Sequence, residues 1–199
     1  MRFINLIFVF VLCAVASNLR SDAPKVPVDI YYEVDCPGCA VLILYTLKDH
    51  MENAALANIT DLHLYPYGNA KTITRDPPTF VCQHGENECR GNMLELCGMK
   101  HYPTTYFPFI LCAERIVTVN DEEATRCAEE TGLDVNTILS CFNGPEALLL
   151  HLECGDATPA HDSVPLLMVN HVIVKDTNSL SKEVCDAYEG VKPEVCKNL

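Results

Sequence analysis

Hydrophobic positions in residues 26–65 follow a strand pattern, then a helical pattern, then a strand pattern again. Residues 26–33 are rich in β-branched and aromatic side chains, with Pro27 near the start, where a strand tolerates proline. Helical spacing then predicts a helix from about residue 36 to about residue 55. Its apolar positions are Ala40, Ile43, Leu44, Leu47 and Met51. Residues 61–65 alternate and predict a second strand, so this region forms a β-α-β unit with parallel strands.

The chain changes character between about residues 67 and 160. This stretch combines short helical patterns and turn signals with seven cysteines, at positions 82, 89, 97, 112, 127, 141 and 154. Residues 166–169 and 171–174 then predict a β-hairpin, and residues 179–188 predict a last helix. We predict an α/β (α+β) fold, a single thioredoxin-like domain over residues 26–199. Its core is 26–66 and 161–190, and a mostly helical, disulfide-rich insertion occupies about 67–160.

The first sixteen residues have the pattern of a secretory signal peptide. Arg2 precedes an apolar run from Ile4 to Ala16, with small residues at its end. The run is too short to span a bilayer, although a membrane anchor is the competing interpretation. We predict a signal peptide at 1–16, an N-terminal extension at 17–25 and no integral membrane segment. The protein therefore enters the secretory pathway.

Composition agrees with that route. The chain has 12 cysteines, and an oxidising compartment closes most of such a set into disulfides. Cys13 leaves with the signal peptide, so an odd number remains and at least one thiol is unpaired or bonded to another chain. The net charge is −13 and no Lys/Arg cluster occurs, which argues against nucleic acid as a partner. Asn58-Ile59-Thr60 is an N-glycosylation sequon, so we expect Asn58 on the surface.

The run Cys36-Pro37-Gly38-Cys39 stands between the first predicted strand and the first predicted helix. A Cys-x-x-Cys pair beside a β-α pattern is typical of thioredoxin-like redox sites. Unpaired backbone N–H groups at a helix N-terminus stabilise a thiolate, which is the form that attacks disulfides. We predict that Cys36 is the nucleophile and that Cys39 resolves the mixed disulfide. The alternative is one more inert structural disulfide.

Val164-Pro165 is the second candidate element of the site, since a proline in the cis form faces the thiols in thioredoxin-like folds. An ordinary proline at a strand start is the alternative. Among the histidines, His161 is a hypothetical neighbour of the thiols. The run from Cys82 to Cys97 also contains Cys89 and His84, a set that could bind metal. Its spacing matches no common zinc pattern, so we predict no metal site.

The same run resembles the signature Cys-Gln-His-Gly-x-x-Glu-Cys-x-x-Asn-x-x-x-x-Cys of the gamma-interferon-inducible lysosomal thiol reductase (GILT) family, at every fixed position. The resemblance covers nearly all of residues 26–196. It includes Cys36 and Cys39 at the family's active pair, residues 66–70 at its Pro-Tyr-Gly-Asn-Ala segment, and Val164-Pro165. It departs at Ser163 and Leu166, where the family has aromatic residues, which puts substrate preference in doubt.

The resemblance also sorts the remaining cysteines. Eight are candidates for structural disulfides: Cys82, Cys89, Cys97, Cys112, Cys127, Cys141, Cys185 and Cys196. They allow 105 connectivities, of which only Cys185–Cys196 is predicted, because these two match the family's C-terminal pair. Cys154 has no family counterpart. It is the candidate free thiol, either buried and inert or the link of a disulfide-bonded dimer.

The resemblance implies a thiol-disulfide oxidoreductase that reduces protein disulfides at acidic pH, in the lysosome or outside the cell. The implied substrates are disulfide-containing, unfolded proteins. We predict no cofactor beyond the Cys36/Cys39 dithiol, with an external small thiol as electron donor. The alternatives are a secreted, non-catalytic binding or immunomodulatory protein on the same scaffold, and a disulfide oxidase or isomerase.

Overall fold

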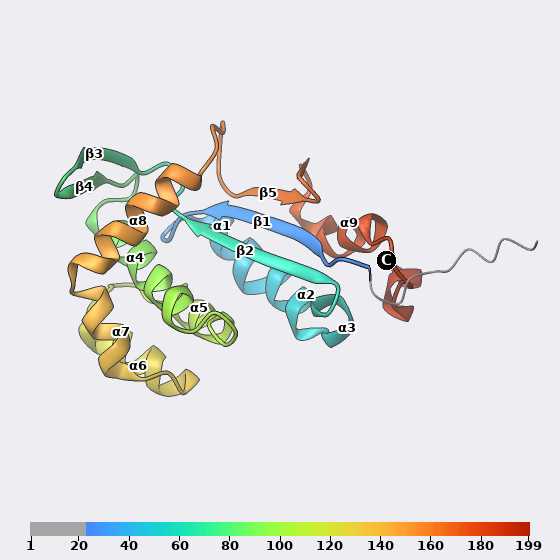
Figure 1. Ribbon diagram of the computed structural model, residues 1–199, viewed down its shortest axis with the longest axis horizontal. Helices are drawn as coiled ribbons and strands as arrows, with labels where there is room; N and C mark the ends of the chain where they lie inside the picture. Colours follow the sequence, from blue (N-terminus) through green and yellow to red (C-terminus); the bar gives the residue numbers. More distant parts are fainter. Residues whose placement is uncertain (1–22) are drawn as a thin grey trace, which may run out of the picture.

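The computed structural model of the chain describes residues 23–199. The predicted signal peptide 1–16, and the predicted extension as far as residue 22, lie outside the described residues. Two parts lie side by side, one built on a sheet and one built on helices (Figure 1). Within the described part, no helix has both the length and the apolar character needed to cross a membrane.

The main sheet has four strands in the order β2-β1-β5-β6. They are β1 (Val26–Tyr32), β2 (Thr60–Pro66), β5 (Leu166–Val169) and β6 (Val172–Val174). β1 pairs with β2 in parallel, and β5 pairs with both β1 and β6 in antiparallel orientation. β1 is an inner strand, and all its residues except Pro27 are buried, which is why it contains so many apolar side chains. The predicted β-α-β unit and C-terminal hairpin are confirmed.

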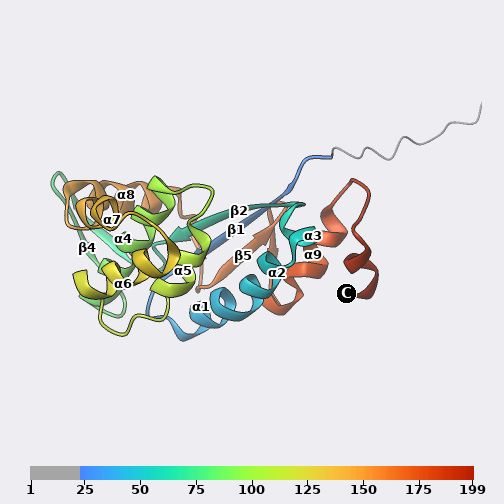
Figure 2. The ribbon, with the colours of Figure 1, turned by 90° about the horizontal axis from the view of Figure 1, so that it is seen from below.

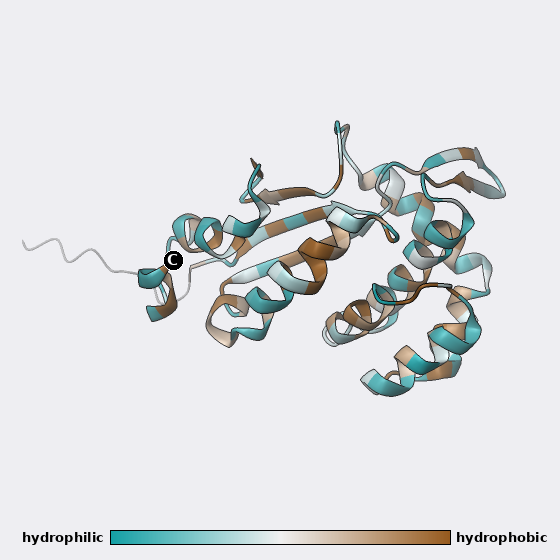
Figure 3. Ribbon diagram, turned by 180° about the vertical axis from the view of Figure 1, so that it is seen from behind, coloured by the Kyte–Doolittle hydropathy of each residue, from teal (hydrophilic) through white to brown (hydrophobic). Residues whose placement is uncertain are grey.

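Helices cover one face of this sheet, as the view from behind shows (Figure 3). The first helical run comprises α1 (Pro37–Val41), the π-helical η1 (Leu42–Leu47) and α2 (Lys48–Glu52). It ends three residues before the predicted end at about residue 55. The side chain of Asn53 accepts hydrogen bonds from the backbone N–H groups of Ala55 and Leu56, and so begins the separate α3 (Ala54–Ala57). The last helix, α9 (Leu180–Ala187), packs beside this run.

The core of this part is made of large aliphatic side chains from the sheet and its helices. Ile30, Ile43, Leu47 and Leu180 are all fully buried in it. We call the four strands together with α1–α3 and α9 the sheet unit. Two short 3₁₀ segments, η2 (Thr177–Ser179) and η3 (Glu194–Asn198), complete its C-terminal region.

The second part, the helical lobe, consists of the helices between β2 and β5. They are α4 (Glu86–His101), α5 (Phe107–Ala113), α6 (Asp121–Thr131), α7 (Val135–Phe142) and α8 (Pro145–Ala157). A hairpin of β3 (Lys71–Arg75) and β4 (Pro78–Val81) precedes them (Figure 2 shows β4 beside α4). This hairpin was not predicted from the sequence. Its signal was the β-branched run at residues 72–74, followed by a turn at Pro77.

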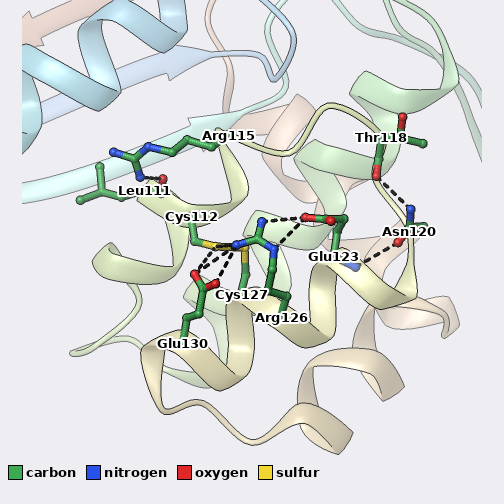
Figure 4. Close-up of polar contacts among 9 residues, drawn as sticks. All are labelled: Leu111, Cys112, Arg115, Thr118, Asn120, Glu123, Arg126, Cys127 and Glu130. Carbon is green, nitrogen blue, oxygen red and sulfur yellow. Dashed lines mark hydrogen bonds and ion pairs between the residues drawn. A yellow bond between two sulfur atoms is a disulfide. The ribbon is translucent and has the colours of Figure 1, made fainter.

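Four disulfides join the candidate structural cysteines. They are Cys82–Cys89, Cys97–Cys141, Cys112–Cys127 and Cys185–Cys196. Figure 4 shows the bridge that ties α5 to α6, where Arg126 lies over the sulfurs and forms ion pairs with Glu123 and Glu130. The first three bridges all lie in the helical lobe or at its entrance.

Helix α4 joins the two parts. Gly91 lies so close to Val34 that an added Cβ would come within 2.5 Å of its side chain, so glycine permits this approach. The side chain of Asn92 accepts a hydrogen bond from the backbone N–H of Val34 at 2.9 Å. The hydroxyl of Tyr32 donates to Oε2 of the buried Glu95 at 2.5 Å. These contacts fix the start of α4 beside the end of β1, immediately before Cys36.

Candidate active site

Cys36 occupies the N-cap position of α1, and Pro37 takes the first helical position, where its missing N–H is not needed. The Sγ atom of Cys36 accepts a hydrogen bond from the backbone N–H of Cys39 at 3.4 Å. Cys36 is half-buried, Cys39 is fully buried, and both are free thiols. The outer sulfur can therefore meet a substrate while the inner sulfur stays behind it.

The inner thiol is held in its protonated form. Burial raises the pKa of Cys39 far above its ordinary value, and a hydrogen bond with the side chain of Cys36 raises it further. The backbone of Glu33 opposes this with a hydrogen bond to the same sulfur. The two cysteines are therefore unequal: Cys39 is buried and favours its protonated form, whereas Cys36 is only half-buried.

The loop before β5 lies against this pair. The Val164–Pro165 peptide bond is cis, and an added Cβ on Gly38 would lie 3.5 Å from the ring of Pro165. A cavity opens beside the outer cysteine, between this loop and the entrance to the helical lobe. It is lined by Glu33, Cys36, Pro37, Asn69, Gln83, His84, Asp162, Ser163 and Val164. Residues from three distant segments thus surround one sulfur atom.

A hydrogen-bond network forms one wall of this cavity. Nδ1 of His84 lies 2.9 Å from Oε2 of the fully buried Glu88 and 3.6 Å from Oε1 of Glu33. The backbone N–H of His84 donates to the same Glu88 oxygen, and the backbone N–H of Asn69 donates to Glu33. Burial raises the pKa of Glu88, while the bonds from His84 lower it. The position of His84 beside the thiols could not be predicted from the sequence, because it depends on how α4 docks.

The second cysteine run offers no free thiolate to a metal ion, because Cys82, Cys89 and Cys97 are all in disulfides. Atoms of Glu33, His84 and Glu88 that are of metal-binding type lie within 4.8 Å of one another. The oxygens of Glu33 and Glu88 nearest the imidazole already accept hydrogen bonds from nitrogen. We therefore describe the cluster as a hydrogen-bond network.

The other candidate residues lie away from the dithiol cavity. His161 lines a second cavity, which shares Asp162 and Ser163 with the first, and its Nδ1 lies 2.8 Å from the carbonyl oxygen of Pro159. Asn58 is exposed in the turn before β2, as a glycosylation site requires. Cys154 is a free thiol on α8 that is only 6% exposed. Burial raises its pKa to about 12, so this thiol is unreactive in the folded protein.

Comparison with known proteins agrees with this geometry. Residues 27–131 match the family model described as gamma interferon inducible lysosomal thiol reductase (GILT). The chain is 35% identical over 190 residues to the gamma-interferon-inducible lysosomal thiol reductase of Carassius auratus, a match covering 89% of this chain and 74% of the relative. It is 34% identical to the gamma-interferon-responsive lysosomal thiol protein of Arabidopsis thaliana, over 87% of this chain and 76% of that protein.

Solved structures give the same fold at low identity. Oxidised BdbD from Bacillus subtilis superposes with a TM-score of 0.59 at 14% identity, over 83% of this chain and 90% of that one. A thioredoxin-like oxidoreductase from Silicibacter pomeroyi DSS-3 gives 0.57 at 15% identity, over 83% and 87%. The predicted thioredoxin-like fold class is confirmed. The chain belongs to the gamma-interferon-inducible lysosomal thiol reductase family and is a thiol-disulfide oxidoreductase.

Proposed function

We propose that this protein reduces disulfides in partly unfolded proteins through the Cys36/Cys39 dithiol, at acidic pH, in the lysosome or outside the cell. The observation that carries the proposal is the inequality of the two thiols. Cys36 is accessible and caps a helix with its sulfur, while Cys39 is buried one turn behind it. Family membership and the sulfur geometry support the same chemistry.

The reaction has two exchanges. The thiolate of Cys36 attacks one sulfur of a substrate disulfide, forms a mixed disulfide and releases the other sulfur as a thiolate. Cys39 then loses its proton and attacks Sγ of Cys36, which closes the Cys36–Cys39 disulfide and releases the second substrate thiolate. The substrate gains two electrons and two protons, and the protein loses them. An external small thiol then restores the dithiol.

The surroundings of Pro165 suit an extended polypeptide. A second cavity continues from this proline along β5 and β6, lined partly by Leu166, Leu167 and Ile173, and two of the β6 side chains are exposed. An unfolded chain offers apolar side chains and free backbone groups to such a surface, whereas a folded protein hides both. This supports unfolded proteins as the substrate class.

The acidic compartment is proposed from two observations. The relatives from Carassius auratus and Arabidopsis thaliana carry the word lysosomal in their names. Independently, burial raises the pKa of the Glu95 carboxyl group well above its ordinary value and that of Glu114 to about 8, so both groups favour the protonated form in the folded protein. The stability that these groups contribute is therefore fully present at acidic pH and is lost as the pH rises.

The test is reduction of a denatured disulfide protein at about pH 5 by the reduced enzyme. Cys36→Ser should lower the rate by at least about 10³-fold, because the nucleophile is lost. Cys39→Ser should trap the mixed disulfide, seen as a thiol-sensitive adduct on a gel. Cys154→Ser serves as the matched control and should react as the wild type. Equal rates for the wild type and Cys36→Ser would instead support the binding-protein alternative.

A further inference from the structure

The Gln83-His84 pair of the signature run lies in the cavity of the outer cysteine, yet the exchanges described above assign it no task. We propose that His84 is the general acid of this site and protonates the thiolate that leaves the substrate disulfide, with Glu88 as its positioning residue. The inference rests on the proposed function, since it assigns a proton donor to the Cys36 reaction.

The hydrogen bonds of the imidazole leave one nitrogen available. Nδ1 is 2.9 Å from Oε2 of Glu88, and the backbone N–H of His84 fixes that same oxygen. Among residues 23–199, nothing bonds to Nε2. A buried carboxylate that holds one ring nitrogen while the other serves a nucleophile is the arrangement by which proteins orient catalytic histidines.

The carboxylate is placed for this purpose. Glu88 is fully buried, and its Oε1 atom has no hydrogen-bond partner within the described chain. Its hydrogen bonds therefore go to His84 alone. The other charged or titratable groups around the imidazole and the cavity are Glu33, Asp162 and the thiol of Cys36. No Lys or Arg lines the cavity, which leaves His84 as its one basic side chain.

With this assignment, the proton that the leaving thiolate needs in the first exchange comes from a residue of the site. Sγ of Cys36, as a thiolate, forms a bond to the near sulfur of the substrate, and the substrate S–S bond breaks with its electron pair on the far sulfur. The imidazolium of His84 gives that sulfur its proton and becomes neutral imidazole. One negative and one positive charge disappear together. Solvent at acidic pH returns the proton to His84.

Leaving groups of different basicity test the step. An alkyl thiolate needs a proton on leaving, whereas an aryl thiolate bearing electron-withdrawing groups is stable without one. His84→Gln keeps a donor towards Glu88 but has no exchangeable acid. It should slow the first exchange with a dialkyl disulfide by at least about tenfold at pH 5. With the aryl disulfide it should slow the exchange by less than about twofold, and both rates are measured by stopped flow in a single turnover.

Two further variants separate this role from a structural one. His101→Gln is the matched control, because His101 also pairs with a glutamate at 3.1 Å and its side chain is 31% exposed, against 32% for His84. It should react as the wild type with both substrates. Glu88→Gln keeps a hydrogen-bond acceptor. Like His84→Gln, it should slow the exchange with the dialkyl disulfide and not with the aryl disulfide, but by a smaller factor.

The possible results separate the inference about His84 from the proposed function. Loss confined to the dialkyl substrate supports the inference. An equal loss with both substrates, or no loss with either, overturns it while leaving the dithiol intact. If the wild type reacts with neither disulfide, or Cys36→Ser reacts as the wild type, the proposed function itself is wrong.

Discussion

The sheet unit and the helical lobe use cysteine in opposite ways. In the sheet unit, Cys36 and Cys39 stay reduced at a helix start, and the outer thiol is accessible. In the helical lobe and at its entrance, six cysteines are closed into three buried bridges. The same residue is thus a free thiol in one part and a structural bond in the other, and its position in the fold decides which.

The two cores explain why the lobe needs covalent bonds. The sheet unit buries mainly Ile, Leu, Val and Tyr. The core of the helical lobe includes four alanines and four cysteines among its buried residues: Ala113, Ala124, Ala128, Ala147, Cys97, Cys112, Cys127 and Cys141. Small side chains bury little apolar area, so hydrophobic burial stabilises each lobe residue less. The bridges add stability by restricting the unfolded chain.

The largest expected stability change comes from removing a lobe bridge. Cys97 and Cys141 are separated by 44 residues, and chain entropy assigns a loop of that length about 4 kcal/mol. The double variant Cys97→Ala/Cys141→Ala should lose about that much free energy of unfolding, measured by urea denaturation. The initial rate of Cys36 alkylation in the folded fraction should stay the same, because the dithiol is built on the sheet unit.

The C-terminal bridge is the matched comparison for that loss. Cys185 and Cys196 enclose only 11 residues, for which the same relation gives about 3 kcal/mol. If removing the short bridge lowers the free energy of unfolding more than removing the long one, restriction of the unfolded chain is not the main way in which the disulfides stabilise the lobe.

The next effect concerns the boundary between the two parts. Burial raises the pKa of Glu95 well above its ordinary value and that of Glu114 to about 8. The folded protein therefore keeps protons that the unfolded chain releases near pH 4.5. This contribution to stability is complete below that pH and is lost as the pH rises through about 8. We expect the urea midpoint to fall between pH 5 and pH 8.

Glu95→Gln tests this assignment. The amide oxygen still accepts the hydrogen bond from Tyr32, but the position no longer titrates. The variant should flatten the pH dependence by on the order of 2 kcal/mol between those two pH values. A wild-type protein as stable at pH 8 as at pH 5 would contradict the raised pKa values of the two carboxyl groups.

The smallest effect is expected at the third free thiol. Cys154→Ala removes a buried, unreactive sulfur from α8, so the reduction rate should not change and the free energy of unfolding should fall by about 1 kcal/mol. Rapid alkylation of the native protein should label Cys36 and spare Cys154. A dimer band on a non-reducing gel that disappears in Cys154→Ala would show that this thiol links two chains.

Local sequence signals predicted the sheet unit well. The strand at residues 26–33, the helix after it and the hairpin around Asn170 all follow from spacing and turn chemistry that neighbouring residues determine. The position of Cys36 and Cys39 at a strand-to-helix junction was also predictable, because the sequence displays that junction directly.

The rest depended on contacts between distant segments. His84 lies 48 positions from Cys36 in the sequence and reaches its cavity only because α4 docks on the end of β1. The electrostatic influence of Glu114 on Glu95 likewise requires α4 and α5 to be placed first. Periodicity gives the face of a helix but not its partner, so the lobe was predicted as a set of helices without an arrangement.

The hydrogen bond from the N–H of Cys39 to the sulfur of Cys36 has a consequence for the energetics of the catalytic cycle. Such a bond is stronger when the acceptor is charged, and closing the disulfide removes that charge. The hydrogen bond of this N–H is therefore stronger in the dithiol state than in the disulfide state. This difference shifts the redox equilibrium of the pair towards the dithiol. A weak reductant is then enough to reduce the Cys36–Cys39 disulfide again. The protein in turn reduces only substrate disulfides that are easier to reduce than its own.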